Sequence, residues 1–265
     1  MTSLIDKFVL ITGATSGIGY QLAKLFAEHD YNLVIVARTK SQLDQMASEF
    51  SEEYDIQVVA IEKDLFKKES AFELYEEISL RGITIDILVN DASQGLYGKF
   101  TDTDINKELD MLQLNIGAYL VLTKYFLREM VERGEGKILN VASIAGKVPG
   151  PYQSVYHGTK AFVHSFTESI RAEVEGSGVT ITSLLPGATN TDFFNKADML
   201  SSKIMDSEMA DPAEVARDGF NALMEGDDMV ISGLKNKAQV AMSNMTPDSI
   251  VAKGMLKQQE PRDTH

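Results

Sequence analysis

The chain has 265 residues, of which 44% are hydrophobic and 24% are charged, a composition that fits one large globular domain. Its net charge of −14 argues against nonspecific binding to nucleic acid or to anionic membranes. Because the chain has no cysteine, disulfides, a thiolate nucleophile and a thiolate metal site are excluded, and we expect no metal. No apolar run approaches the roughly 20 residues of a membrane-spanning helix, and no signal segment is recognisable, so we expect a cytoplasmic protein.

Strand-like and helix-like segments alternate along the chain. Strands are predicted at Phe8–Thr12, Asn32–Ala37, Gln57–Lys63, Ile85–Asn90, Lys137–Ala142, Thr180–Leu185 and Met229–Ile231. Helices are predicted near Ile18–His29, Lys40–Phe50, Lys67–Arg81, Thr103–Arg133, Val155–Gly176 and Pro212–Glu225. This alternation predicts an α/β fold, a doubly wound parallel sheet of about seven strands with helices on both faces. We expect a catalytic domain over 1–233, followed by a helical extension and tail over 234–265 that is not a separate domain.

A glycine-rich turn joins the first strand to the first helix. It reads Thr12-Gly13-Ala14-Thr15-Ser16-Gly17-Ile18-Gly19. Glycines let the backbone approach a phosphate closely, and the free N–H groups at a helix start favour negative charge. The turn therefore predicts a cradle for nucleotide phosphates, although its spacing differs from the general Gly-x-Gly-x-x-Gly fingerprint. A purely structural turn is the alternative.

The end of the second strand bears on the choice of cofactor. Ala37 is followed by Arg38, and the nearest acid, Asp44, lies a turn into the next helix. An acid at the strand end suits the ribose hydroxyls of NAD, whereas a guanidinium binds a 2′-phosphate. We therefore expect NADP(H) in preference to NAD(H), with assistance from Lys40. In the alternative interpretation, Arg38 is an ordinary solvated loop residue.

A third motif combines Ser143, at the end of an apolar run, with Tyr156-His157-Gly158-Thr159-Lys160. Side chains four residues apart lie on one face of a helix, and a nearby cation lowers the pKa of a phenol. Tyr156 is therefore a candidate general acid/base, and the Ser143 hydroxyl is a candidate to bond a substrate oxygen. Taken alone, the tyrosine and lysine also fit an ordinary amphipathic helix.

Together, in this order, these motifs resemble the short-chain dehydrogenase/reductase family, in its branch with a single Rossmann-type domain. The resemblance spans roughly Asp6 to Ser232. Further landmarks are Asn90-Asp91-Ala92-Ser93, where the family usually has Asn-Asn-Ala-Gly, then Asn115, and then Pro186-Gly187 with Thr191 just beyond.

The resemblance implies a role for each matching residue. The implied catalytic residues are Asn115, Ser143, Tyr156 and Lys160. The implied cofactor-binding residues are Gly13, Thr15, Ser16, Gly17, Ile18, Gly19, Arg38, Asp64, Leu65, Asn90, Ala92, Tyr156, Lys160, Pro186, Gly187, Thr189 and Thr191. Asp64 fits equally well as the N-cap of the following helix. Asp91 replaces an asparagine that helps to brace the sheet, and Ser93 replaces a glycine, so we expect altered local hydrogen bonding without loss of cofactor binding.

The activity implied is hydride transfer between NADP(H) and a carbonyl or secondary alcohol. Tyr156 would exchange the proton and Ser143 would polarise the substrate oxygen. Lys160 would bind ribose and lower the Tyr156 pKa, and Asn115 would serve the proton relay. His157 is disfavoured as a rival base and is expected on the helix surface or at a subunit contact, facing away from Tyr156. The alternatives are a non-catalytic NADP(H)-binding regulatory protein and an epimerase or dehydratase of the same superfamily.

The substrate is expected to be a small, partly apolar carbonyl or alcohol. A lid at about 188–210 carries the apolar candidates Phe193, Phe194, Met199, Leu200, Ile204 and Met205. Beyond the domain, Asn236–Asn244 and Asp248–Gln258 are predicted helices that pack on the domain or on a partner subunit, and Gln259–His265 is predicted to be a loose tail. By resemblance we expect a homodimer or homotetramer built through the helices Thr103–Arg133 and Val155–Gly176.

Overall fold

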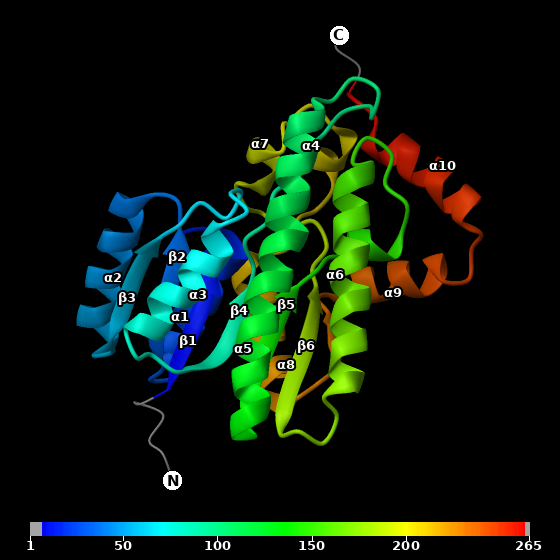
Figure 1. Cartoon of the computed structure of the whole chain (residues 1–265). Coiled ribbons are helices and arrows are strands. Elements are labelled where there is room, and N and C mark those ends of the chain that lie inside the picture. The colour runs from blue at the N-terminus through cyan, green and yellow to red at the C-terminus, as the bar shows by residue number, and fades with distance from the viewer. Residues whose placement is uncertain (1–6, 263–265) are drawn as a thin grey trace.

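Seven parallel strands form the central sheet of the protein in a computed structural model that describes residues 7–262 (Figure 1). The strands are β1 (Phe8–Thr12), β2 (Asn32–Ala37), β3 (Val58–Glu62), β4 (Ile85–Asn90), β5 (Gly136–Val141), β6 (Val179–Leu185) and β7 (Met229–Ile231). Their order across the sheet is β3-β2-β1-β4-β5-β6-β7, and every neighbouring pair is parallel. The predicted doubly wound sheet is confirmed, and strand ends differ from the prediction by a residue at most.

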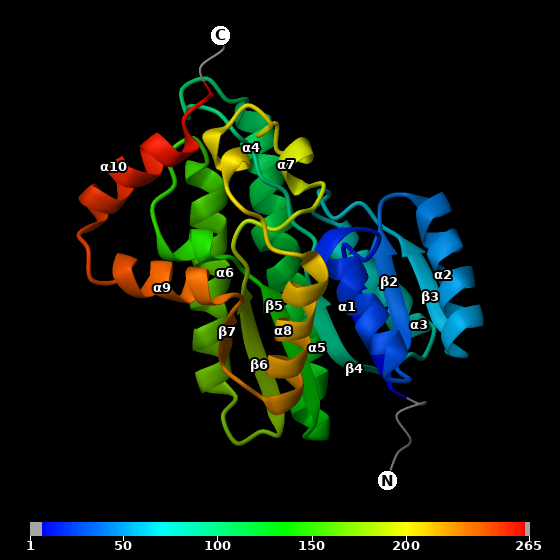
Figure 2. The same ribbon diagram turned by 180° about the vertical axis from the view of Figure 1, so that it is seen from behind.

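Helices cover both faces of this sheet, because the inner strands are apolar on both sides. The helices are α1 (Gly17–Glu28), α2 (Lys40–Tyr54), α3 (Ser70–Leu80), α4 (Ile105–Leu112), α5 (Tyr119–Arg133), α6 (Ser154–Glu173), α7 (Phe193–Lys196), α8 (Pro212–Glu225), α9 (Leu234–Ser243) and α10 (Asp248–Gln259). One core cluster joins α1, α2 and α8 through Phe26, Phe50 and Phe220, on the side seen in Figure 2. A second joins α3 and α5 through Leu74 and Phe126 on the side seen in Figure 1.

The strand order reverses between β1 and β4, and this point positions the site. The chain runs outward from β1 to β3 and then returns to place β4 on the other side of β1. In such sheets a crevice opens at the carboxyl ends of the two strands. Here the Thr12 hydroxyl oxygen accepts hydrogen bonds from the backbone N–H groups of Asp91 and Ala92, at 3.1 and 3.2 Å, and so fixes the loop after β4 against the end of β1.

The long helix predicted at Thr103–Arg133 contains an irregular turn. It is divided into α4, a π-helical turn over Gln113–Ala118, and α5. Such turns are rare and occur frequently at functional sites. The wide turn places Asn115 in the interior, where its side chain is fully buried. Propensity rules do not predict a π-turn, because the same residues fit a regular α-helix.

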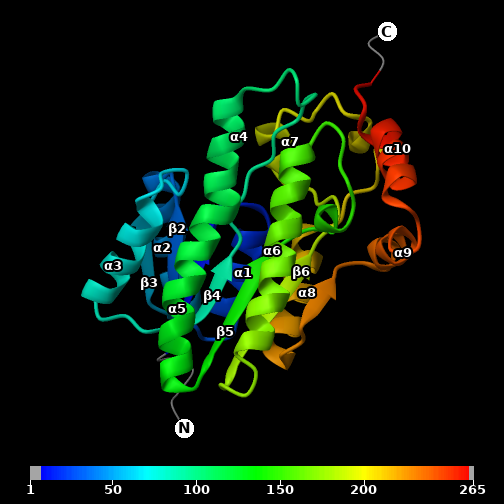
Figure 3. The ribbon, with the colours of Figure 1, turned by 45° about the vertical axis from the view of Figure 1, so that its right-hand side comes forward.

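The prediction of a loose tail over Gln259–His265 is wrong for residues 259–262, the part of it that the structure describes. Residues 259–262, here called the C-terminal strap, comprise the last residue of α10 and the three that follow it, and they lie against the lid (Figure 3). The backbone N–H of Lys203 donates to the Glu260 carbonyl at 3.1 Å, and that of Arg262 donates to the Ser201 carbonyl at 2.7 Å. Gln259 is only 1% exposed. Residues 263–265, also assigned to the tail, lie outside the described residues. None of the helices within 7–262 is long and apolar enough to cross a membrane.

Candidate active site

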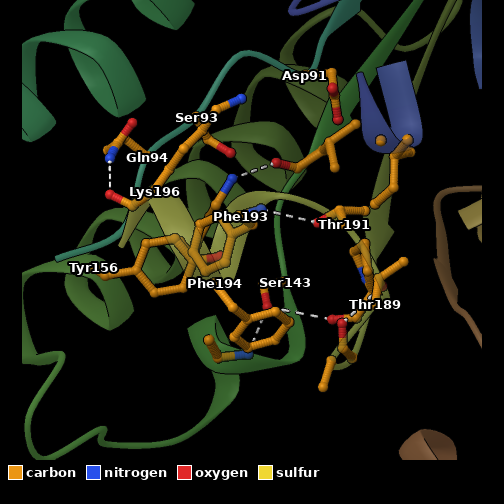
Figure 4. Close-up of a pocket in the computed structure, with 18 of the residues that line it drawn as sticks. Asp91, Ser93, Gln94, Ser143, Tyr156, Thr189, Thr191, Phe193, Phe194 and Lys196 are labelled. Carbon is orange, nitrogen blue, oxygen red and sulfur yellow. Dashed lines mark hydrogen bonds between the residues drawn. The ribbon is translucent and has the colours of Figure 1, made fainter. Parts of the chain in front are cut away.

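A cavity of about 870 Å³ lies at the carboxyl ends of the strands. The predicted site residues that line it are Gly13, Thr15, Ser16, Gly17, Ile18, Arg38, Leu65, Ala92, Ser143, Tyr156, Lys160, Pro186, Gly187, Thr189 and Thr191. Four others, Gly19, Asp64, Asn90 and Asn115, are not among the described lining residues. The cavity therefore brings together the glycine-rich turn, the arginine after β2 and the serine–tyrosine–lysine set. Figure 4 shows the part of it around Tyr156.

The glycine-rich turn presents backbone to the cavity. Gly13 and Gly17 have φ of 73° and 58°, which only glycine adopts without strain. Within the described chain, the Ser16 side chain makes no capping bond to α1, which leaves the start of the helix open to an anion, although the Gly19 N–H of its first turn is bonded to Asp91. Gly19 acts from beneath the turn: a Cβ there would lie 2.6 Å from both the Gly13 carbonyl oxygen and Asp91 Oδ2.

Arg38 is exposed at the mouth of the cavity. Its guanidinium carbon lies 5.0 Å from the centroid of the Phe66 ring, and Leu65 and Phe66 line the cavity with it. Asp64 Oδ1 accepts the Phe66 N–H at 3.3 Å in the turn after β3, and the alternative role as N-cap of the next helix is wrong, because α3 begins at Ser70 with Glu69 as its N-cap. Lys40 is paired with Asp44 at 3.1 Å on the exposed face of α2.

The structural roles of the residues after β4 differ from the predicted roles. Asn90, not the following position, braces the sheet: its Nδ2 donates to Thr123 Oγ1 at 3.0 Å and to Asn140 Oδ1 at 2.9 Å. Asp91 lines the cavity, where its carboxylate accepts a hydrogen bond from the Gly19 backbone N–H. The acid therefore lies under the phosphate cradle and not within the sheet.

Ser143, Tyr156 and Lys160 meet where β5 ends and α6 begins. Ser143 Oγ accepts the Ala145 N–H at 3.1 Å, donates to the Pro186 carbonyl at 3.2 Å, and shares a hydrogen bond with Tyr156. Lys160 is 1% exposed, and its Nζ donates to the Val141 carbonyl at 2.8 Å. That Nζ lies 5.9 Å from the centroid of the Tyr156 ring.

The expected lowering of the Tyr156 pKa is not found. Burial raises the pKa of Tyr156, the hydrogen bond with Ser143 opposes this, and the charge of Asp91 adds to the rise. Burial likewise raises the pKa of Asp91 and lowers that of Lys160, while each group's charge opposes the shift of the other. The charge of Lys160 is therefore balanced by Asp91, and its Nζ donates to the Val141 carbonyl. Tyr156 accordingly remains a neutral phenol.

Asn115 fastens two parts of the site together from behind the cavity. Its Oδ1 accepts the Gln94 N–H at 3.0 Å, and its Nδ2 donates to the Gln94 carbonyl at 2.9 Å and to Thr159 Oγ1 at 3.0 Å. The π-helical turn thus joins the loop after β4 to the helix that carries Tyr156.

Two polar residues of the site escaped the sequence analysis. His157 was expected on the helix surface or at a subunit contact, but it is 5% exposed and lines the cavity, with its ring centroid 6.1 Å from that of Tyr156. Burial lowers the pKa of His157, and its Nδ1 bonds the Val148 carbonyl at 2.8 Å. Gln153, at the N-cap of α6, is also buried in the lining. His157 lies inside the tyrosine motif, but its neighbours in sequence do not show which side of the helix is covered, and Gln153 belongs to no motif that the sequence marks.

The lid forms an apolar wall over the tyrosine. The ring of Phe193 lies 5.1 Å from that of Tyr156, centroid to centroid, and the two are neighbours in Figure 4. Phe194 and Met199 are buried in a small lid cluster with Ile204 and Met205 at its edge, whereas Leu200 is exposed. The segment is anchored at its start by Thr191, whose Oγ1 accepts the Phe193 N–H at 3.3 Å.

A doubly wound parallel sheet with a cleft at its switch point defines the protein as a Rossmann-type α/β protein. The sequence model described as short chain dehydrogenase matches residues 7–199, and the chain belongs to this family of oxidoreductases.

Three relatives illustrate the match. The chain is 34% identical over 191 residues to an uncharacterized oxidoreductase of Staphylococcus aureus (strain MRSA252), covering 72% of this chain and 81% of that protein. It is 35% identical over 188 residues to a very-long-chain 3-oxoacyl-CoA reductase of Anas platyrhynchos, covering 69% of this chain and 59% of that one. A solved short-chain dehydrogenase from Sphingobium yanoikuyae, in complex with NADPH, superposes with a TM-score of 0.83 at 27% identity, covering 97% and 99% of the two chains.

Proposed function

We propose that the protein is an NADP(H)-dependent carbonyl reductase that also oxidises the corresponding secondary alcohols. The observation that carries this proposal is the placement of Ser143, Tyr156 and Lys160 in one cavity with the glycine-rich turn and Arg38. A protein that only bound the nucleotide would have no chemical need for a phenol and a hydroxyl bonded to each other at the cavity wall.

The cavity fits a phosphorylated dinucleotide. The start of α1, which has no side-chain cap from Ser16, would face the pyrophosphate, and Arg38, stacked on Phe66, offers a guanidinium to a 2′-phosphate. Lys160 would donate to the nicotinamide ribose, and Pro186, Gly187, Thr189 and Thr191 would line the nicotinamide end. NADPH in the related Sphingobium structure supports the same choice.

Bound NADPH would supply the hydride. The neutral phenol of Tyr156 would donate its proton to the substrate oxygen as negative charge develops there, and Ser143 would hold that oxygen by a hydrogen bond. Because burial and Asp91 both keep Tyr156 protonated, the site is suited to reduction at neutral pH. Asn115 would support the proton relay by fixing the π-helical turn against Gln94 and Thr159.

The substrate would be a partly apolar ketone or aldehyde. Phe193, Phe194 and Met199 present carbon and sulfur to the cavity beside Tyr156. The very-long-chain 3-oxoacyl-CoA substrate in the name of the Anas relative agrees with an apolar pocket. We further propose a homo-oligomer, because α4, α5 and α6 carry exposed apolar side chains that include Ile105, Leu109 and Phe162.

The test is the oxidation of NADPH and NADH against a panel of ketones and aldehydes, with wild-type protein and Tyr156→Phe. Positioned proton transfer is worth about 10²–10⁴-fold, so turnover by the variant should fall at least about 100-fold. Its NADPH affinity, measured by fluorescence titration, should be nearly unchanged. Tyr125→Phe, at a tyrosine whose ring stacks on Tyr75 of α3 and which is not among the described cavity-lining residues, is the matched control and should behave as wild type. Near-wild-type turnover by Tyr156→Phe would overturn the proposal.

A further inference from the structure

One end of the cavity is built from polar groups that the proposed chemistry does not use. Gln153, His157 and Gln259 all line the cavity, and their side chains are 5%, 5% and 1% exposed. Two come from the first turn of α6 and its cap, and the third comes from the C-terminal strap. Gln153 and His157 are four residues apart, as are Tyr156 and Lys160, so the two pairs occupy adjacent faces of one helix.

Hydrogen bonding fixes the orientation of His157 and Gln259. The Val148 carbonyl can only accept, so His157 Nδ1 carries the proton of its 2.8 Å bond. Because burial lowers the pKa of His157, the ring is neutral and its Nε2 is an acceptor. The group of Gln259 that lies 3.3 Å from Nε2 must therefore be the amide NH₂. The Gln259 carbonyl oxygen, Oε1, is consequently turned to the other side.

Two acceptors are left without partners by this arrangement. Among residues 7–262, neither Gln259 Oε1 nor Gln153 Oε1 has a hydrogen-bond partner, although both atoms are buried. Buried carbonyl groups are nearly always bonded, because leaving one unpaired costs about 1–3 kcal/mol. Both residues belong to the cavity lining, so a group within the cavity is the natural donor.

The position of Gln259 is held firmly from its backbone. The backbone carbonyl oxygen of Gln259, as distinct from the side-chain Oε1, accepts a hydrogen bond from Tyr97 Oη at 2.6 Å and another from Ser202 Oγ at 3.0 Å. On the next residue, Glu260, the side chain pairs with Lys203 at 2.6 Å. The strap is thus fixed to the loop after β4 and to the lid, and the Gln259 amide is a built part of the cavity wall.

We propose that Gln153, His157 and Gln259 form a substrate subsite that binds a hydrogen-bond donor, a hydroxyl or an amide N–H, at a distance from the reacting carbonyl. The proposal rests on the carbonyl reductase function above and specifies its substrate class. One donor group reaching both oxygens, or two neighbouring donors, satisfies the orphaned acceptors, whereas a group with acceptors alone leaves them unpaired. The preferred substrate is then an apolar carbonyl compound that carries a hydroxyl or amide N–H beyond its apolar portion.

The experiment uses matched pairs of methyl ketones of increasing chain length, each with its ω-hydroxy counterpart, and NADPH as reductant. Wild-type kcat/KM should favour the hydroxylated member at one chain length by about tenfold or more, since a buried polar site rejects an analogue that lacks the matching group. Gln259→Met and Gln153→Met, which keep side-chain volume, should each lower kcat/KM for that hydroxy ketone by about tenfold. Both should leave the parent ketone within about twofold. Gln45→Met, on the exposed face of α2, is the matched control.

The outcomes separate this inference from the function on which it rests. Failure of the wild-type protein to reduce any ketone with NADPH refutes both. If ketones are reduced but no hydroxy ketone is preferred at any length, the subsite is refuted alone, and a permanently bound water must satisfy the two oxygens. If the Met variants lose equal kcat/KM on the hydroxy ketone and on its parent ketone, the subsite is also refuted, because a displaced strap would have that effect. If Gln259→Met does not fold, the Gln153→Met ratio decides, because Gln153 has no part in the strap.

Discussion

Among single residues, Asp91 has the largest effect on the charges of the site. Its carboxylate receives the Gly19 N–H beneath the phosphate cradle, and its charge acts on both Lys160 and Tyr156. A neutral asparagine at this position would leave the lysine charge unbalanced beside the phenol. The carboxylate therefore opposes formation of the Tyr156 phenolate.

Replacement of this acid should change the pH dependence of alcohol oxidation. Oxidation needs the phenolate, so kcat rises as pH rises through the Tyr156 pKa, which the Asp91 charge raises. Asp91→Asn removes that charge, lowers the Tyr156 pKa, and should move the rising limb of the pH–kcat profile to lower pH. Steady-state oxidation of a secondary alcohol with NADP⁺ across pH measures this.

Asp86→Asn is the control, because Asp86 lies in β4, the strand that precedes Asp91, and acts on Tyr31 instead. A rising limb that stays in place, or moves to higher pH, in Asp91→Asn would show that Asp91 does not influence the phenol. A shift of equal size in both variants would point to a general charge effect.

At the scale of elements, the contact of α1 with the glycine-rich turn depends on one missing side chain. A Cβ at Gly19 would meet the Gly13 carbonyl oxygen at 2.6 Å, and backbone cannot yield as a flexible side chain does. The helix start and the phosphate cradle would have to separate. The same substitution at Gly158 on α6 meets no described atom within 4 Å.

Gly19→Ala should therefore weaken NADPH binding by at least about tenfold and lower the thermal midpoint, because overpacking costs about 1–3 kcal/mol. Gly158→Ala should instead raise the free energy of unfolding by about 0.5–1 kcal/mol, since alanine suits a helix interior better than glycine. Titration calorimetry and urea denaturation measure the two effects. Unchanged NADPH affinity in Gly19→Ala would contradict the proposed cradle.

At the scale of the whole molecule, α4, α5 and α6 expose apolar side chains on one side. Exposed positions there are Ile105, Leu109, Leu112, Leu120 and Phe162, with Leu109 at 54%. A patch of this kind on a protein with net charge −14 is typical of a protein interface. It lies on the helices by which the sequence predicts assembly.

Wild-type protein should accordingly sediment as a dimer or tetramer, and Leu109→Glu should shift it toward monomer by placing charge in an apolar interface. Analytical ultracentrifugation over a range of concentrations measures the mass. Leu80→Glu, at an 89% exposed position on α3, is the control and should leave the mass unchanged. A monomeric wild type would refute the proposed assembly.

Much of this architecture could be predicted because it depends on patterns of residues that are close together in the sequence. The seven strands are continuous apolar runs separated by amphipathic helices, and the positions of the glycine-rich turn and of Tyr156 and Lys160 follow from short spacings. Long-range contacts were not accessible. The bond between Gln259 and His157 joins residues 102 positions apart, and Asn115 reaches Gln94 only through a π-turn.

The pKa of Tyr156 was mispredicted for a related reason. The four-residue spacing predicts that Lys160 lies near Tyr156. It does not predict that Lys160 Nζ donates to the Val141 carbonyl or that Asp91 balances the lysine's charge. Burial, the largest cause of the shift, depends on packing by distant segments such as the Phe193 side chain of the lid. Sequence spacing contains neither quantity.

The shared origin of Tyr156 and His157 on α6 has a consequence for selectivity. A helix of this length is a stiff rod, so the proton donor and the histidine that orients the Gln259 amide cannot move apart independently. The distance between the proton donor and the polar subsite is then fixed. The protein would discriminate among otherwise similar molecules by the number of bonds between their two polar ends, and lengthening a molecule by one methylene would matter more than changing the character of its middle.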